Sequence, residues 1–183
     1  YSLLNTTHTA MGARLLRHWL HHPLQDRAQV SARHDAVAYL IASDRYQNLN
    51  LALKAVGDIE RITARVALKT ARPRDLSGLT LSLQALPALQ AGLQGLTSTL
   101  LQSLLANMQP PIDVINLLQK AIKPEPSVVL RDGGVIADGF DAELDELRNL
   151  QSNHGEFLLE FEAAEKARTG IANLKVEYNS VHG

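Results

Sequence analysis

Residues 140–169 read FDAELDELRNLQSNHGEFLLEFEAAEKART, and this stretch decides the fold. It contains no proline, and its large apolar side chains recur near one stripe of a helix: Phe140, Leu144, Leu147, Leu150, Leu158 and Phe161. At ~1.5 Å per residue, one helix over this range would be on the order of 45 Å long. The sequence therefore predicts a long, rigid helix that ends at Gly170, because glycine favours the left-handed backbone that closes a helix.

The charges in this stretch fit a helix that is largely exposed. Glu143 and Asp145 lie in its first turns and Lys166 and Arg168 in its last turn, an order that the helix dipole favours. Because only a narrow stripe is apolar, half of the helix must face water or wait for a partner helix. The alternating residues 174–178 then predict a strand whose neighbours are missing.

The stretch before residue 124 has helical periodicity almost throughout, and aromatic residues make up only 4% of the chain. We expect helix N-caps at Thr9 and Asp58 and a break at Pro87. The expected helices lie at 9–22, 28–42, 44–56, 58–69, 73–94, 98–107 and 111–122. The sequence thus predicts an all-α fold, a multi-helix bundle with the leucine-rich stretch 76–118 as core material.

One β feature is expected between the bundle and the long helix. The segments 127–131 and 135–136 flank Asp132-Gly133-Gly134, and paired glycines accept the positive φ angles that tight turns require, so a small hairpin is predicted. The predicted organisation is a helical core domain over residues 1–139. A long protruding helix and a truncated β segment follow over residues 140–183.

Composition narrows the setting of the protein. The chain has no Cys and no run of the roughly 18 apolar residues that span a bilayer, so we expect no disulfide, no thiolate site and no membrane association. A cytoplasmic location is expected. The chain begins at Tyr1 rather than Met and stops at Gly183 just after the start of the expected strand, which indicates a piece excised from a longer protein.

The sequence contains no pattern that predicts a reaction centre. His18 and His22 share a helix face, but no carboxylate completes a His-Glu-x-x-His pattern, so surface histidines near a helix end are expected. The acids at 141–146 are expected on a solvated surface. A general acid and a general base need a pocket that drives their two pKa values apart, and such a surface does not provide one. Neither Asp132-Gly133-Gly134 nor Asp138-Gly139 leads into the Lys-Ser/Thr of a phosphate-binding loop. We expect no catalytic, cofactor or metal site.

DNA contact is expected, if anywhere, at the far end of the chain. Residues 138–165 hold many acids and a single base, Arg148, so this surface repels phosphate. Basic character returns at Lys166, Arg168 and Lys175, close to Asn179 and His182. The candidate DNA-binding residues are Lys175, Asn179 and His182, and ordinary helix capping and strand solubility are the alternative explanation for this basic end.

Six phrases, in order, resemble the MutS family of DNA mismatch repair proteins, and the resemblance covers essentially the whole chain. They are Thr9-Ala10-Met11-Gly12-Ala13-Arg14-Leu15-Leu16-Arg17-His18-Trp19-Leu20 with Pro23-Leu24; Asp58-Ile59-Glu60-Arg61 with Arg65; Arg72-Pro73-Arg74-Asp75-Leu76; Asp132-Gly133-Gly134-Val135-Ile136 with Gly139-Phe140-Asp141; Glu143-Leu144-Asp145; and Arg168-Thr169-Gly170-Ile171 with Leu174-Lys175-Val176 and Tyr178-Asn179. Phe140 stands where Tyr is common in the family, and Glu177 where Gly is common. The carboxylate of Glu177 counts against a direct phosphate contact at that position.

The resemblance implies a fragment of the MutS core, or lever, domain with the start of the clamp domain. In that family the lever helix carries a clamp that closes non-specifically on duplex DNA, and a separate ABC-type ATPase domain binds ATP and Mg²⁺. It also implies a homodimer that works with a MutL-type partner. We therefore expect this segment to couple the ATPase domain to the clamp and to perform no catalysis itself. The alternative is a stand-alone helical module for protein–protein interaction.

Overall fold

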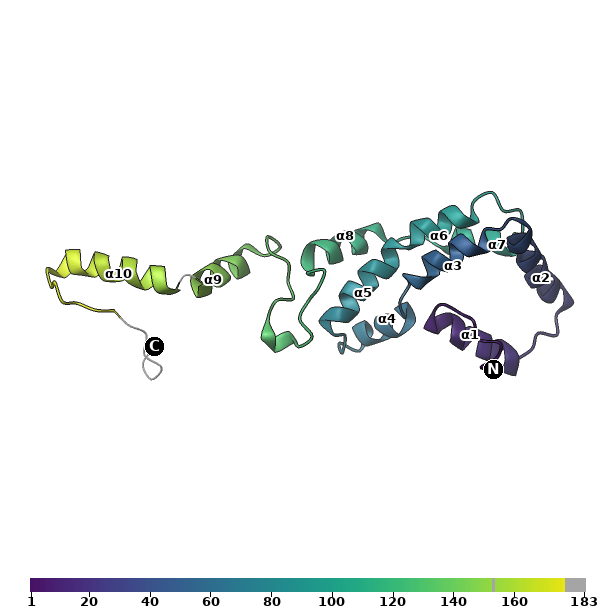
Figure 1. Ribbon diagram of the computed structural model, residues 1–183, viewed down its shortest axis with the longest axis horizontal. Coiled ribbons are helices and arrows are strands. Elements are labelled where there is room, and N and C mark those ends of the chain that lie inside the picture. Colours follow the sequence, from purple (N-terminus) through teal and green to yellow (C-terminus); the bar gives the residue numbers. More distant parts are fainter. Residues whose placement is uncertain (153, 177–183) are drawn as a thin grey trace. The chain divides into compact units, whose positions relative to one another are not determined.

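The computed structural model describes residues 1–152 and 154–176, which are mainly helical and contain no sheet (Figure 1). The predicted all-α fold class is confirmed. The chain divides into two compact units: Tyr1–Ala137, here called unit 1, and the part from Asp138 onward, here called unit 2. The assignment of separate roles to residues 1–139 and 140–183 stays a prediction.

Unit 1 consists of eight α-helices and a short 3₁₀ helix among the residues that the structure describes. The α-helices are α1 (Ala10–His21), α2 (Arg27–Ala42), α3 (Tyr46–Lys54), α4 (Ile59–Ala67), α5 (Pro73–Gln84), α6 (Leu86–Leu93), α7 (Thr99–Asn107) and α8 (Ile112–Ala121). They match the ranges predicted from periodicity. The break between α5 and α6 falls beside Pro87, as expected from a residue that cannot donate a helical hydrogen bond.

Local side-chain chemistry sets where these helices begin. The Thr9 hydroxyl accepts a hydrogen bond from the Gly12 amide at 3.0 Å, and the Asp58 carboxylate accepts one from the Arg61 amide at 3.3 Å. Both predicted N-caps are therefore confirmed. Asp26 caps α2 in the same way through the Ala28 amide at 2.8 Å, because a short acceptor at this position satisfies an otherwise unpaired helical N–H.

Apolar side chains of neighbouring helices form the core of unit 1. Helix α5 packs against α8 and α4, α3 against α6, and α2 against α7. The largest buried cluster comprises Ala36, Leu49, Val56, Leu89, Leu93, Leu96 and Leu101. Gly92 permits the close approach of α6 to α3, because a Cβ there would lie 2.6 Å from Leu49 Cδ2. The leucine-rich stretch supplies much of this core, but Leu81 and Leu104 are at least half exposed.

The predicted hairpin at 127–136 is not confirmed and is corrected here. The 3₁₀ helix η1 (Leu130–Asp132) occupies the middle of the range, and Ile136 forms an isolated antiparallel bridge with Ile122 instead. Gly133 and Gly134 do have positive φ angles of 70° and 66°. However, the Val135 carbonyl accepts a hydrogen bond from the Lys123 amide at 2.9 Å, and the Ala137 amide donates to the Ala121 carbonyl at 2.9 Å, so residues 135–137 pair with the end of α8 rather than with 127–129.

In unit 2, residues 138–152 and 154–176 form two helical elements, α9 (Ala142–Ser152) and α10 (His154–Thr169). Residue 153 between them lies outside the described residues, so the single rigid helix predicted over 140–169 is not confirmed. Gly170, with φ of +70°, ends α10 as expected. Residues 174–176 form no strand, and the rest of the strand predicted at 174–178 lies outside the described residues.

Candidate functional site

A bidentate ion pair joins α1 to the start of α4. Arg14 donates from Nη1 and Nη2 to the two carboxylate oxygens of Asp58, each at 2.7 Å, and from Nη2 to Glu60 at 2.6 Å. These hydrogen bonds from Arg14 lower the pKa of Asp58 from its ordinary 3.8 to about 2. No residue of α1 is buried, and this ion pair anchors α1 on unit 1 together with Met11, which packs against the main buried cluster, and Trp19, whose ring centroid lies 3.7 Å from the Arg33 guanidinium.

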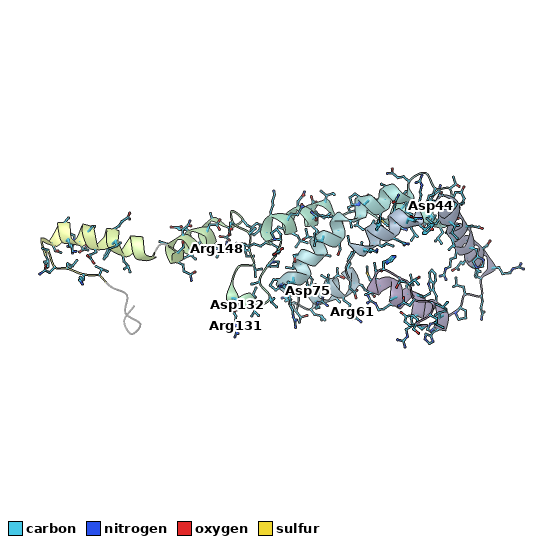
Figure 2. The ribbon with its side chains drawn as sticks, viewed as in Figure 1. Asp44, Arg61, Asp75, Arg131, Asp132 and Arg148 are labelled. Atoms are coloured by element: carbon cyan, nitrogen blue, oxygen red, sulfur yellow. The ribbon has the colours of Figure 1, made fainter. Side chains whose placement is uncertain are left out.

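A second bidentate pair joins α4 to α5. Arg65 donates to Asp75 at 2.8 and 2.6 Å, and the Arg72 amide donates to the same carboxylate at 2.9 Å (Asp75 is labelled in Figure 2). The guanidinium of Arg65 accordingly lowers the pKa of Asp75. The carboxylate thus caps the first turn of α5 while it holds α4, so the two helices are fixed at their adjoining ends.

Ser82 of α5 also holds the turn that precedes α4. Ser82 of α5 is fully buried, accepts a hydrogen bond from the Gly57 amide at 2.9 Å and donates to the Gly78 carbonyl at 2.6 Å. Sequence reasoning isolated the phrases that contain Arg14, Asp58 and Asp75 but paired none of them. A signal for this pairing was present in the sequence, because each phrase places an arginine or a carboxylate in a predicted helix or directly before one.

At the start of unit 2, carboxylates fix the beginning of α9. Asp141 accepts a hydrogen bond from the Leu144 amide at 3.0 Å, and Asp145 accepts one from the Gly139 amide at 2.7 Å. Arg148, labelled in Figure 2, donates to Asp138 at 2.9 Å and to Asp145 at 3.3 Å. These acids therefore act as caps and ion-pair partners, in keeping with the dipole argument made from the sequence.

The basic end of the chain is partly neutralised by its own helix. Lys166 donates to Glu162 at 2.6 Å, and Arg168 donates to Glu165 at 2.7 Å. Of the candidate DNA-binding residues, Lys175 is exposed, whereas Asn179 and His182 lie outside the described residues. The structure thus leaves less of the predicted positive charge available to phosphate than the sequence indicated, because two of the cations already have carboxylate partners.

Glu162 has a role that sequence reasoning missed. Its carboxylate accepts hydrogen bonds from Lys166 and, at 3.0 Å, from the Val176 amide, and these contacts lower its pKa. The chain therefore turns back beyond Gly170 and is held against the side of α10. The spacing of four residues between Glu162 and Lys166 signalled the first contact but not the second.

The histidines and the glycine turns provide no candidate reaction centre. The rings of His18 and His22 stack with centroids 4.5 Å apart on an exposed surface, and no group of three possible ligands for a metal gathers among residues 1–152 and 154–176. Gly133 and Gly134 are not followed directly by a helix, so this turn lacks the helix N-terminus of a phosphate-binding loop. A surface pocket of about 260 Å³ between α5 and α8 has Lys123 as its one ionisable lining residue.

These features define a class of helical domain in which ion pairs between helix ends hold a packed unit together and charged caps anchor a helical extension. The chain belongs to the MutS domain III family, whose model matches residues 1–178. Its role at the level of the family is in MutS-type DNA mismatch repair. Within the described residues, no helix is long and apolar enough to cross a membrane.

Proposed function

We propose that this chain is the lever segment of a MutS-type protein, which transmits the nucleotide state of an ATPase domain to a DNA clamp. The observation that carries the proposal is the difference between the two units. Residues before Asp138 form a core that ion pairs join together, whereas the residues after it form two helical elements, the first of which begins at a set of carboxylate caps. A fixed base with a stiff extension is suited to rigid-body transmission.

The inner half of the lever is supported by the Arg14–Asp58 and Arg65–Asp75 pairs, which join α1 to the start of α4 and the end of α4 to the start of α5. A force applied to one of these helices then moves the others, because bidentate pairs resist rotation as well as separation. The outer half carries apolar side chains, Leu147 and Leu150 on α9 and Phe161 on α10, that are each about half exposed. These side chains fit a partner helix that stiffens the lever.

For DNA contact we propose weak, sequence-independent binding through Lys175, Asn179 and His182, which depends strongly on salt. The same proposal places ATP and Mg²⁺ in the ATPase domain of the complete protein and assigns no catalysis to this chain. Homodimerisation and the MutL-type partner are likewise proposed for the complete protein. A cytoplasmic location follows from the same role.

The test weakens helix α9 at two positions near its end by substitution with glycine. In the complete protein, Leu150→Gly combined with Gln151→Gly would destabilise the helix by about 2 kcal/mol relative to alanines, which raises the population of a broken helix about 30-fold. Stopped-flow fluorescence of a labelled duplex should then show a smaller acceleration of DNA release by ATP. ATP hydrolysis without DNA should stay at the wild-type rate.

The matched control is Leu150→Ala with Gln151→Ala, which removes the same side chains and keeps the helix. If the glycine and alanine variants release DNA equally fast after ATP is added, helix continuity at this position plays no part in coupling. The lever proposal would then fail. If both variants lost coupling to the same extent, the Leu150 contact with a partner helix, which both remove, would be the element that matters.

A further inference from the structure

Unit 1 carries an apolar groove that the proposed lever role does not use. It lies between the entry to α5 and the segment 122–136, and its volume of about 620 Å³ is in the range of known binding pockets. Pro73, Leu76 and Val135 belong to its floor, and the consecutive residues 128–130 form one wall. Pro73 and Val135 are buried, so the floor is part of the folded core.

The wall is an exposed run of three large apolar residues. Val128 is 54% exposed, Val129 41% and Leu130 72%. Such a run is costly in water and is characteristic of an interaction site. The wall is also held in place: the Asp132 amide donates to the Val129 carbonyl at 3.1 Å, and the Ser127 hydroxyl donates to the same carbonyl at 3.1 Å. The apolar side chains are therefore presented by a formed turn.

Of the residues that line the groove, only Arg72 is charged. Arg72 lines the groove and is exposed, and the exposed Lys69 and Arg74 flank it in the sequence. The nearby carboxylate of Asp75 does not cancel them, because Arg65 already binds it in a bidentate pair. The turn itself adds little net charge, since Arg131 lies 3.6 Å from Asp132 (both labelled in Figure 2). An acidic ligand is favoured at this surface.

We propose that this groove binds an acidic amphipathic peptide segment of a partner protein. The segment would place apolar side chains against Val128–Leu130 and Leu76, and a carboxylate beside the guanidinium of Arg72. Apolar contacts supply most of the affinity in such a complex, while the ion pair between the peptide carboxylate and Arg72 selects negatively charged peptides. The proposal goes beyond the lever function and does not depend on it.

The experiment selects a random dodecapeptide library displayed on phage against the whole 183-residue chain. Selection on Leu130→Asp removes clones that bind elsewhere. The enriched peptides should combine leucine-like side chains with Asp or Glu, and the strongest, labelled with fluorescein, should bind the wild type saturably in fluorescence anisotropy. Leu130→Asp and Arg72→Glu should each weaken this binding by about tenfold or more.

The control is Leu104→Asp, because Leu104 is a half-exposed leucine of unit 1 outside the groove. It should bind the peptide like the wild type, and thermal melts should show all three variants folded. Enriched peptides without acidic residues, failure to enrich any peptide over the Leu130→Asp variant, or binding that survives Arg72→Glu would each overturn the proposal. So would self-association in sedimentation velocity that Leu130→Asp abolishes, since a second copy would then occupy the groove.

Discussion

Units 1 and 2 are both helical, but different interactions hold them. In unit 1, buried clusters and ion pairs join residues far apart in the sequence, such as Arg14 and Asp58. In unit 2, α9 has no buried residue, and most contacts described above join residues within one or two helical turns, such as Glu162 and Lys166; the contact of Glu162 with the Val176 amide is the longest in sequence. Unit 1 therefore has the contacts of a cooperative core, whereas the helices of unit 2 depend on local contacts.

This difference bears on the lever proposal. Isolated helices of the length of α9 and α10 are marginal in water, and most helical stability in proteins comes from packing of an apolar face. The stripe containing Leu147 and Leu150 is such a face, and it is about half exposed. Stiffness in unit 2 is therefore expected to be conditional on a partner, whereas stiffness in unit 1 is built in.

The largest effect is expected from truncation of a buried leucine in unit 1, compared with truncation of an exposed leucine in unit 2. Leu101 is 4% exposed within the main cluster, so Leu101→Ala should lower the free energy of unfolding by about 2–5 kcal/mol. Leu147 is 57% exposed, so Leu147→Ala should change it by less than about 0.5 kcal/mol. Urea unfolding followed by far-UV circular dichroism reports on the helices of both units, and the fluorescence of Trp19, the one tryptophan, reports on unit 1. Equal effects of the two substitutions would contradict the contrast between the units.

A smaller effect is expected from the polar link in unit 1. Asp58→Asn keeps a good N-cap residue but removes the charge that faces Arg14, which should cost roughly 1–2 kcal/mol at neutral pH. The pKa of Asp58 is lowered to about 2, so its contribution is present above its unfolded pKa and is lost as the pH falls through the folded value. The difference in unfolding free energy between wild type and variant should therefore shrink from about pH 5 to about pH 2.

Glu60 provides the control for this pH profile, because it also accepts a hydrogen bond from Arg14 but is 70% exposed. Glu60→Gln should cost less than about 0.5 kcal/mol, as exposed ion pairs contribute little. Measurement by urea unfolding at each pH isolates Asp58 from the other acids, since these are shared by wild type and variant. A wild-type to Asp58→Asn difference that stays constant down to pH 2 would show that the ion pair carries no pH-dependent stability.

The parts of the fold that local chemistry decides could be predicted from the sequence. Helix periodicity and capping by Thr9 and Asp58 act over a few residues, and so does the break at Pro87, so they are visible without a structure. The hairpin predicted at 127–136 was not confirmed, because paired glycines indicate a turn but do not specify the partner of the segment that follows it. Here Ile136 pairs with the distant Ile122.

The candidate site was less predictable for the same reason. The phrases around Arg14 and Asp58 were recognised, but their pairing depends on how α1 packs against α4, which periodicity does not specify. At the other end, Lys166 and Arg168 were counted as available cations, although each lies within reach of a glutamate three or four residues earlier. Helical spacing, applied to these pairs, predicts the neutralisation.

The smallest effect is expected from a contact within unit 2, and it tests whether this contact is independent of the stability of unit 1. Glu162→Gln weakens the acceptor for the Val176 amide and removes the charged partner of Lys166, a partly buried arrangement at the side of α10. Amide exchange of Val176, followed by NMR, should accelerate a few-fold while Trp19 fluorescence reports unchanged unfolding of unit 1. Glu165→Gln, which loses only its pair with Arg168, should leave that exchange unchanged. If Glu162→Gln also shifted the unfolding of unit 1, the two units would be energetically coupled and the contrast between them would be wrong.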